Sequence, residues 1–343
     1  MVQKQRVIIL GSNGVGKSNL LESIEFLSQL KSSRALSDKD LINNESEYSK
    51  IYAQINSCEE ININLFRKGQ KKVFVNDNLI KKQSDIKKYV RSVCFSANDI
   101  NIVKGEPNLR RIWLDKVVAQ LEPVYLELLA RFNKLLKQRR HFWRSNFIKN
   151  YSSKELIDSF DSQIALIGAR IMRRRKRALK KLKPYIESWH KYLSKSKEEI
   201  DFNYICALSE WNEEEDEKVI IENLQEKLFK QRHLEEITGK CSIGPHRDDI
   251  EFLINGFSVR KFGSSGQQRT LILAFKMAEL DLLKQVMSIN PILILDDVLA
   301  ELDIFRQNLL LESVGKNSQC LISSTHLEKF NTSFVENSQI IYL

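Results

Sequence analysis

The chain has 343 residues, of which 42% are hydrophobic and 29% are charged, a composition that argues against extensive disorder. No apolar run approaches the roughly 20 residues of a membrane span, and the N-terminus lacks the apolar core of a signal peptide. We therefore expect a cytoplasmic protein without a membrane partner. Its five cysteines form no CxxC pair, which favours buried free thiols over a zinc or redox centre.

The net charge of +10 is concentrated in the middle of the chain. Residues 108–200 contain 23 Lys and Arg but only 9 Asp and Glu, so the remainder of the chain is slightly acidic. Such a local excess indicates a polyanionic partner such as nucleic acid, and the alternative is a long solvated helix face.

The expected elements follow hydrophobic periodicity in chain order. RVIIL (6–10) predicts a strand that ends in a glycine turn, and residues 19–30 repeat apolar positions at helical spacing. Residues 51–95 alternate and predict an antiparallel sheet, with a hairpin turn at the NDN of 76–78.

The second half of the chain changes from helical to strand-like patterns. Residues 108–200 predict two long antiparallel helices, and the segment 210–232 predicts another helix. EFLINGFSV (251–259) reads as a strand, whereas PILILDD (291–297) and QCLISSTH (319–326) have the buried character of parallel central strands.

The octet GSNGVGKS (11–18) matches the phosphate-binding pattern GxxxxGK[ST] between a strand and a helix. Its glycines let backbone N–H groups surround phosphate oxygens, and the following helix adds partial positive charge. Lys17 would reach the β and γ phosphates of ATP, and the Ser18 hydroxyl would bind Mg²⁺. The expected nucleotide-binding residues here are Gly11, Ser12, Asn13, Gly14, Val15, Gly16, Lys17 and Ser18.

PILILDD supplies the carboxylates that such a site requires at the end of a buried strand. Asp296 has the position of the Mg²⁺ partner, and Asp297 that of a catalytic, water-activating group. A buried unpaired carboxylate costs several kcal/mol, a cost that a nearby cation relieves. An exposed pair of acids at a strand end is the alternative.

A second polar turn, FGSSGQQRTL (262–271), opens a helix before the PILILDD strand. It resembles the signature motif of ABC ATPases, whose serine and glycine contact the γ phosphate held by another subunit; Ser264, Gly266 and Gln267 match that motif. AELD (300–303) resembles the D-loop of these ATPases, and His326 has the position of their catalytic switch histidine.

Four phrases make the resemblance more specific: GPHRDD (244–249), SSGQQRT, LDDVLAELD and the segment 95–115. Together they are similar to the bacterial RecF family, on the SMC-like branch of ABC ATPases, over nearly the whole chain. The resemblance implies an α/β, ABC-type ATPase head with a mixed sheet and an antiparallel subdomain, formed by residues 1–107 and 240–343. Residues 108–239 would form an inserted α-helical arm.

In function, the resemblance implies a weak DNA-dependent ATPase that binds ATP and Mg²⁺ and forms an ATP-dependent homodimer. That dimer would bind single-stranded or gapped DNA in replication, recombinational repair and SOS induction, and help RecA load together with RecO and RecR. The alternatives are a non-hydrolysing nucleotide-gated DNA scaffold or another ABC ATPase subunit.

The sequence departs from the pattern of the family or of ABC ATPases in general in three places. Only ten residues precede the P-loop, so we expect a late start or a truncation that removes adenine-side contacts. Asp297 stands at the position where ABC ATPases usually have glutamate. The RecF family tends to have aspartate there as well, and the shorter acid predicts slow hydrolysis. No Q-loop glutamine is evident, and Asn98 or Asp99 are its candidates.

Several arginine-rich motifs leave two interpretations open. His246 and Arg247 of GPHRDD have either a positioning or interface role or a direct contact with nucleotide or DNA. Arg110 and Arg111 either belong to the start of a surface helix or sense nucleotide or face DNA. The remaining candidates lie in the basic middle segment, where they either contact DNA or pack within the arm: the run Arg173–Arg177, and the KQRRHFW group of Arg139, Arg140, Phe142 and Trp143.

Overall fold

A computed structural model describes residues 4–35, 37–55, 59–149, 154–195, 198–208, 211, 215–286, 290–314 and 318–343. The chain divides into two compact units. The first contains residues 1–99, 192–195 and 269–343, and the second contains residues 100–191 and 196–268. Among the described residues, no helix is long and apolar enough to cross a membrane.

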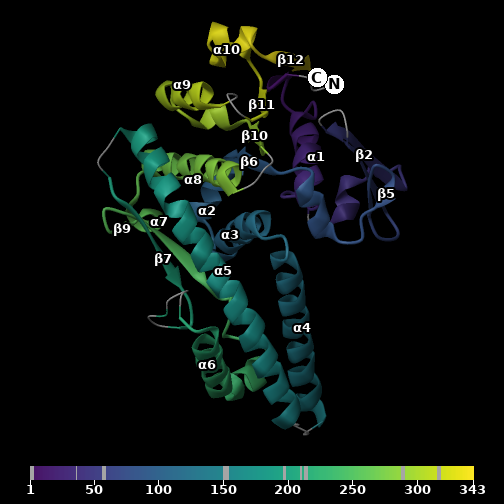
Figure 1. Ribbon diagram of the computed structural model, residues 1–343, viewed down its shortest axis with the longest axis vertical. Coiled ribbons are helices and arrows are strands. Elements are labelled where there is room, and N and C mark those ends of the chain that lie inside the picture. Colours follow the sequence, from purple (N-terminus) through teal and green to yellow (C-terminus); the bar gives the residue numbers. More distant parts are fainter. Residues whose placement is uncertain are drawn as a thin grey trace. The chain divides into compact units, whose positions relative to one another are not determined.

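A parallel five-stranded sheet in the order β12-β1-β11-β10-β6 forms the centre of the first unit (Figure 1). PILILDD and QCLISSTH supply β10 and β11, which confirms the prediction of parallel central strands. Because all five strands run in one direction, their carboxyl ends share one edge of the sheet. The strands are β1 Arg6–Leu10, β6 Ser92–Ser96, β10 Ile292–Asp296, β11 Cys320–Ser324 and β12 Gln339–Tyr342.

The antiparallel sheet predicted for residues 51–95 is also present, in the order β2-β3-β4-β5. Asn76 and Asp77 both have positive φ and form the two-residue hairpin turn expected at NDN. The strands are β2 Tyr48–Ile55, β3 Glu59–Phe66, β4 Lys72–Val75 and β5 Asn78–Leu79.

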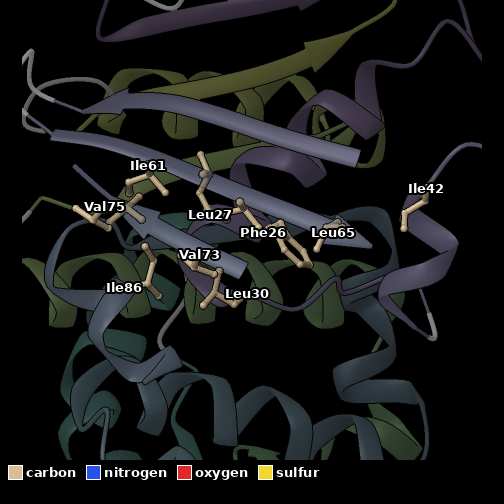
Figure 2. Packing of buried hydrophobic residues seen from close by; sticks show 11 residues of the cluster. Phe26, Leu27, Leu30, Ile42, Ile61, Leu65, Val73, Val75 and Ile86 are labelled. Atoms are coloured by element: carbon tan, nitrogen blue, oxygen red, sulfur yellow. The ribbon is translucent and has the colours of Figure 1, made fainter. Parts of the chain in front are cut away.

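Helix α1 (Lys17–Gln29) packs against both sheets of the first unit. Its Leu21 joins the apolar cluster of the parallel sheet. Phe26 and Leu27 contact the inner face of the antiparallel sheet, as Figure 2 shows. That inner face buries alternate residues of β3 and β4, namely Ile61, Ile63, Leu65, Val73 and Val75. The helix that follows the P-loop is therefore held firmly on two sides.

The second unit contains the long helices and a three-stranded sheet in the order β7-β8-β9. In Figure 1, α4 and α5 run side by side, and Phe142 and Trp143 of α4 form one apolar cluster with Ile157 and the partly buried Phe160 of α5. The main elements are α3 Pro107–Leu121, α4 Tyr125–Lys149, α5 Lys154–Ser194, α6 Glu217–Thr238, β7 Ile200–Ile205, β8 Asp249–Ile254 and β9 Phe257–Ser258.

Three element predictions were wrong in detail. The first long helix is divided into α3 and α4, because Pro123 lacks the N–H that a continuous helix requires. EFLINGFSV is a hairpin, with Asn255 and Gly256 at positive φ between β8 and β9. Helix α6 begins at Glu217 and ends at Thr238, later at both ends than the predicted 210–232.

The cysteine prediction is only partly confirmed. Four described cysteines are free thiols, but only Cys320 is fully buried, whereas the side chains of Cys94, Cys206 and Cys241 are half-buried. Cys58 lies outside the described residues.

Candidate nucleotide-binding site

The P-loop connects β1 to α1 at the carboxyl edge of the parallel sheet. Gly14 and Gly16 have φ of 84° and 107°, in a region that L side chains rarely adopt. Both are open to their surroundings, since a Cβ at either position would meet no atom of the described residues within 4 Å. The loop therefore has the shape that lets backbone N–H groups approach a ligand closely.

Lys17 is buried, and its Nζ donates to the carbonyl oxygens of Gly11 and Ser12 at 2.8 and 2.9 Å. Among the described residues its ammonium group makes no ion pair. A buried cation held only by neutral carbonyls is matched chemically by a phosphate, which supplies the missing negative charge.

The acidic end of β10 meets the start of α1 through hydrogen bonds. The Ser18 hydroxyl donates to Oδ1 of Asp296 at 3.0 Å, and the Ser323 hydroxyl donates to the same oxygen at 2.9 Å. Asp296 is buried. A hydroxyl beside a buried carboxylate is a donor set suited to Mg²⁺, so these two residues fit the metal that the sequence predicts.

Asp297 is held beside this pair in an uncommon backbone conformation. Its φ is 53°, which aspartate tolerates better than most residues, and its N–H donates to Oγ of Ser323 at 2.8 Å. The side chain is half-buried. Strained residues often occur at functional sites because the surrounding structure fixes the direction of the side chain.

Arg34 is a participant that the sequence analysis missed. It lies in the loop after α1 and forms an ion pair with Oδ2 of Asp296. Its guanidinium provides positive charge to the buried carboxylate, as a metal ion would. The only sequence signal was a lone arginine soon after the P-loop helix, which is not specific.

His326 and the Q-loop candidates follow strands of the same sheet. His326 is exposed just after β11, which lies between β1 and β10, so it emerges on the edge that carries the P-loop and Asp296. Asp99 is occupied, because it accepts from the Ser96 N–H at 2.7 Å and pairs with Lys276 at 3.1 Å. Asn98 is exposed beyond β6 and is the better placed candidate.

The second polar turn belongs to the second unit and caps helix α8 (Ser265–Val286). The Ser264 hydroxyl accepts from the Gln267 N–H at 3.1 Å, and the Gln267 side chain accepts from the Ser264 N–H at 2.8 Å. This is a capping box. In the part of the chain that the structure describes, a Cβ on Gly266 would meet the Ser264 hydroxyl, at 3.9 Å, and no other atom within 4 Å. Ser264 is exposed, so the helix start is open to a ligand.

The D-loop segment is tied to the part of α8 that lies in the first unit. Arg269 pairs with Glu301 at 3.1 Å, and Arg306 donates to the Thr270 hydroxyl at 2.8 Å. Asp303 caps helix α9 (Ile304–Ser313) by accepting from the Arg306 N–H. Residues 300–303 are thus fixed to one helix.

GPHRDD is used for packing inside the second unit. Arg110 makes a bidentate ion pair with Asp249, and Arg111 donates to the Asp248 carbonyl. The side chain of His246 contacts the Cys241 carbonyl at 2.9 Å, and burial lowers its pKa to about 4. A neutral histidine at pH 7 offers no charge to a phosphate, so these contacts support the positioning interpretation of GPHRDD. The alternative of a surface helix start is wrong for Arg110, because its side chain is buried.

Most of the arginine run on α5 is occupied within the arm. Arg173 and Arg174 pair with Glu217 and Glu122, and Arg175 is buried in contact with Asp115. Lys176 donates to the carbonyl of Trp211. The expectation that this run faces phosphate is therefore weakened, because these cations already have partners.

The KQRRHFW group is divided between the interior and the surface. Arg139 is buried and pairs with Asp161 and Glu235, and the rings of Phe142 and Trp143 pack 5.3 Å apart in the interior. The packing interpretation is correct for these three residues. Arg140 is exposed.

Arg140 belongs to a basic surface of α4. The sequence analysis did not distinguish this surface from the other basic residues of segment 108–200. Its side chains are exposed and recur every three or four residues, and none pairs with an acid among the described residues. The stripe spans about 20 Å of helix at 1.5 Å per residue. This α4 stripe consists of Arg131, Lys134, Lys137, Arg140 and Arg144.

Comparison with known proteins gives consistent results. The family described as RecF/RecN/SMC N terminal domain matches residues 1–342. The chain is 44% identical over 336 residues to the DNA replication and repair protein RecF of Synechococcus sp. (strain CC9605), covering 98% of this chain and 92% of that protein. It is 45% identical over 337 residues to the protein of that name from Parasynechococcus marenigrum (strain WH8102), with the same coverage.

Solved structures agree with the sequence relatives. The recombination mediator protein RecF with ATPrS, of the RecFOR pathway, superposes with a TM-score of 0.86 at 31% identity, covering 95% of this chain and 87% of that chain. The ATP complex of RecF superposes with a TM-score of 0.85 at the same identity and coverage. An Smc head bound to a domain of ScpA shares the fold, with a TM-score of 0.51 at 15% identity and coverage of 99% and 87%.

The P-loop geometry predicts a specific effect of Gly16→Ala. A Cβ at φ 107° strains the backbone by about 1–3 kcal/mol, and relief of this strain would turn the N–H groups away from the phosphates. We expect calorimetric titration to show a large loss of Mg-ATP affinity. Gly239→Ala, at φ 62° in a C-cap that is equally open, is the matched control and should bind normally; equal losses in both variants would contradict the prediction.

Proposed function

Because the chain belongs to the RecF family of SMC-like ABC ATPases, we propose that it is an ATP-gated DNA-binding protein of replication and recombinational repair. The observation that carries this proposal is the meeting of Lys17, Ser18 and Asp296 at one edge of the parallel sheet. In this role the protein is cytoplasmic and works with RecO and RecR to help RecA load on single-stranded or gapped DNA, with a link to the SOS response.

The proposed mechanism is a nucleotide-dependent dimer. Lys17 binds the triphosphate, Ser18 and Asp296 hold Mg²⁺, and the exposed start of α8 at Ser264 and Gly266 contacts the triphosphate bound by a second copy. The metal would offset the negative charge of the phosphates and of Asp296. Moving a dimerisation equilibrium from 1:99 to 99:1 requires about 5.5 kcal/mol, which two shared triphosphates can supply.

Hydrolysis then returns the dimer to its open state. Asp297 orients the attacking water, and its fixed backbone keeps the carboxylate beside the metal ligand Asp296. His326 lies on the same edge of the sheet and would contact the γ phosphate. We propose weak, DNA-dependent hydrolysis, since aspartate is shorter than the glutamate usual at this position and therefore reaches the water less well.

The capping box allows a sharp test of the shared site. Aspartate and asparagine cap helices about as well as serine, but only Ser264→Asp places negative charge against a partner's triphosphate. We expect sedimentation velocity with ATP to show loss of the dimer for Ser264→Asp and its retention for Ser264→Asn, with normal ATP binding by both monomers. Loss of ATP binding by the Ser264→Asp monomer would mean that the turn serves its own P-loop.

A second variant separates an ATPase from a non-hydrolysing scaffold. For Asp297→Asn we expect single-turnover hydrolysis to fall by about 10²–10⁴-fold, with ATP-driven dimerisation retained, because the amide cannot accept a proton from water. Asp296→Asn, which alters the metal site, should weaken Mg-ATP binding as well. The scaffold alternative gains support if the wild-type protein dimerises with ATP yet turns over no faster than Asp297→Asn.

The DNA contact is proposed on the α4 stripe. Its cations have no acidic partner among the described residues, so a phosphate backbone can neutralise them without breaking internal ion pairs. Binding of this kind is independent of sequence and decreases with salt as counterions return to the DNA.

Salt titration distinguishes the α4 stripe from the arginine run on α5. Replacing Lys134, Lys137 and Arg140 by Gln should reduce the slope of log K against log salt for duplex DNA by about 3, at roughly 0.9 per phosphate contact. The matched triple variant, with Arg170, Arg173 and Arg174 replaced by Gln, removes the same charge from residues that already have acidic partners and should keep the slope. The opposite pattern would place the DNA on α5.

A further inference from the structure

The antiparallel sheet of the first unit has a second face, none of whose residues belongs to the nucleotide site described above. Its inner face packs on α1 (Figure 2), and side chains alternate along each strand, so the intervening residues point outward. Along β2 these residues are Tyr48, Lys50, Tyr52 and Gln54, all exposed. On β3 and β4 they include one acid, Glu60 opposite Gln54, and Asn62, Asn64, Phe66, Lys72 and Phe74.

Strand register arranges the outward residues in rows of alternating character. Tyr48 lies beside Phe66 in the first row. The middle row is basic and polar, and contains Lys50, Asn64 and Lys72. The third row contains two aromatic residues, Tyr52 and Phe74, together with Asn62 and Leu79. Successive rows are two residues apart along a strand, or about 6.8 Å.

The aromatic rings on this face are unusually exposed. Tyr48 is 62% exposed and Tyr52 is 55% exposed, whereas most large aromatic side chains contribute to interiors. Phe66 and Phe74 are half-buried beside them, and Lys72 Nζ lies 6.0 Å from the centre of the Phe66 ring. We name the surface formed by Tyr48, Tyr52, Lys50 and Lys72 the outer sheet face.

We propose that the outer sheet face binds unpaired nucleotides of single-stranded DNA, an inference that rests on the proposed DNA-binding function and adds a second contact to it. The two exposed tyrosines offer flat apolar surfaces on which bases stack, and stacking tolerates any base. Tyr48 and Tyr52 are four residues apart on β2, or about 13.6 Å, so an extended single strand would stack non-adjacent bases on the two rings.

Charge favours a nucleic acid over a protein partner on this face. Lys50 and Lys72 are exposed between the two aromatic rows, where the phosphates of a strand stacked on both rows would pass. Residues 48–82 contain seven Lys and Arg but only three Asp and Glu. A rigid duplex cannot present its bases to a sheet, because they are stacked and paired, so this geometry selects the unpaired strand.

The test compares labelled oligothymidylate with a blunt duplex by fluorescence anisotropy, using the full chain without nucleotide and with ATP. We expect the double variant Tyr48→Ala/Tyr52→Ala to bind oligothymidylate at least tenfold more weakly, because two stacking contacts are lost, and to bind the duplex normally. Tyr48→Phe/Tyr52→Phe keeps both rings and should bind as the wild type does. Phe229→Ala removes an equally exposed ring, 64% exposed on α6, and is the matched control.

Photo-cross-linking supplies a direct readout. Oligonucleotides that contain 5-iododeoxyuridine should cross-link to Tyr48 or Tyr52, and peptide mapping would identify the site. Cross-links confined to other parts of the chain would overturn the proposal, as would an unchanged oligothymidylate affinity in the double alanine variant. Equal losses for oligothymidylate and duplex would also overturn it, since stacking is specific to unpaired bases.

The remaining outcomes separate this inference from the proposed function. The wild type could show no ATP-driven dimer and no duplex binding, while the tyrosine variants still change oligothymidylate binding. In that case the proposed mechanism is wrong, but single-strand binding by the outer sheet face is supported. If the double alanine variant instead dissociates a nucleotide-free dimer in sedimentation, the face binds a second copy of the chain, and the single-strand proposal is wrong.

Discussion

The hydrogen bond from Ser18 to Asp296 joins two segments that are 278 residues apart in sequence, and the nucleotide site depends on it. It brings the start of the P-loop helix to the end of the strand that carries both candidate carboxylates. Ser323, on β11, donates to Asp296 and accepts from the Asp297 N–H, so helix α1 and strand β11 together fix the acidic pair at the end of β10. Parallel strand order makes this possible, because it collects the carboxyl ends of β1, β10 and β11 at one edge.

Charge has three different uses in this protein. In the second unit, buried ion pairs such as Arg139 with Asp161 and Glu235 join separate helices. Removing these charges from water costs free energy, but the pairs fix the geometry of the helices. The cations of the α4 stripe remain exposed and without acidic partners among the described residues. In the nucleotide site, Lys17 and Arg34 supply positive charge at the positions where phosphate and metal are proposed to bind. Composition alone does not distinguish these uses, since all of them contribute equally to the net charge.

Helix α1 links the nucleotide site to the antiparallel sheet. Its first turn carries Lys17 and Ser18, and its last turns place Phe26 and Leu27 in the core beneath β3 and β4. Because the antiparallel sheet packs against α1 through one face, its opposite face is available for another purpose. The proposed stacking of single-stranded DNA on Tyr48 and Tyr52 therefore uses a surface that is rigid because its other side is packed.

The sequence by itself determined the P-loop, the acidic strand end at Asp296 and Asp297, and the parallel and antiparallel strands, because these depend on local spacing and periodicity. Tertiary structure decided which charges are accessible. Arg173, Arg174 and Arg175 looked like a phosphate-binding run, yet distant acids occupy them, while the α4 stripe remained exposed. It also decided that Arg34 reaches Asp296 and that Tyr48 and Tyr52 share one face with Lys72. Pairing and burial depend on residues far away in sequence, and a local pattern contains no information about them.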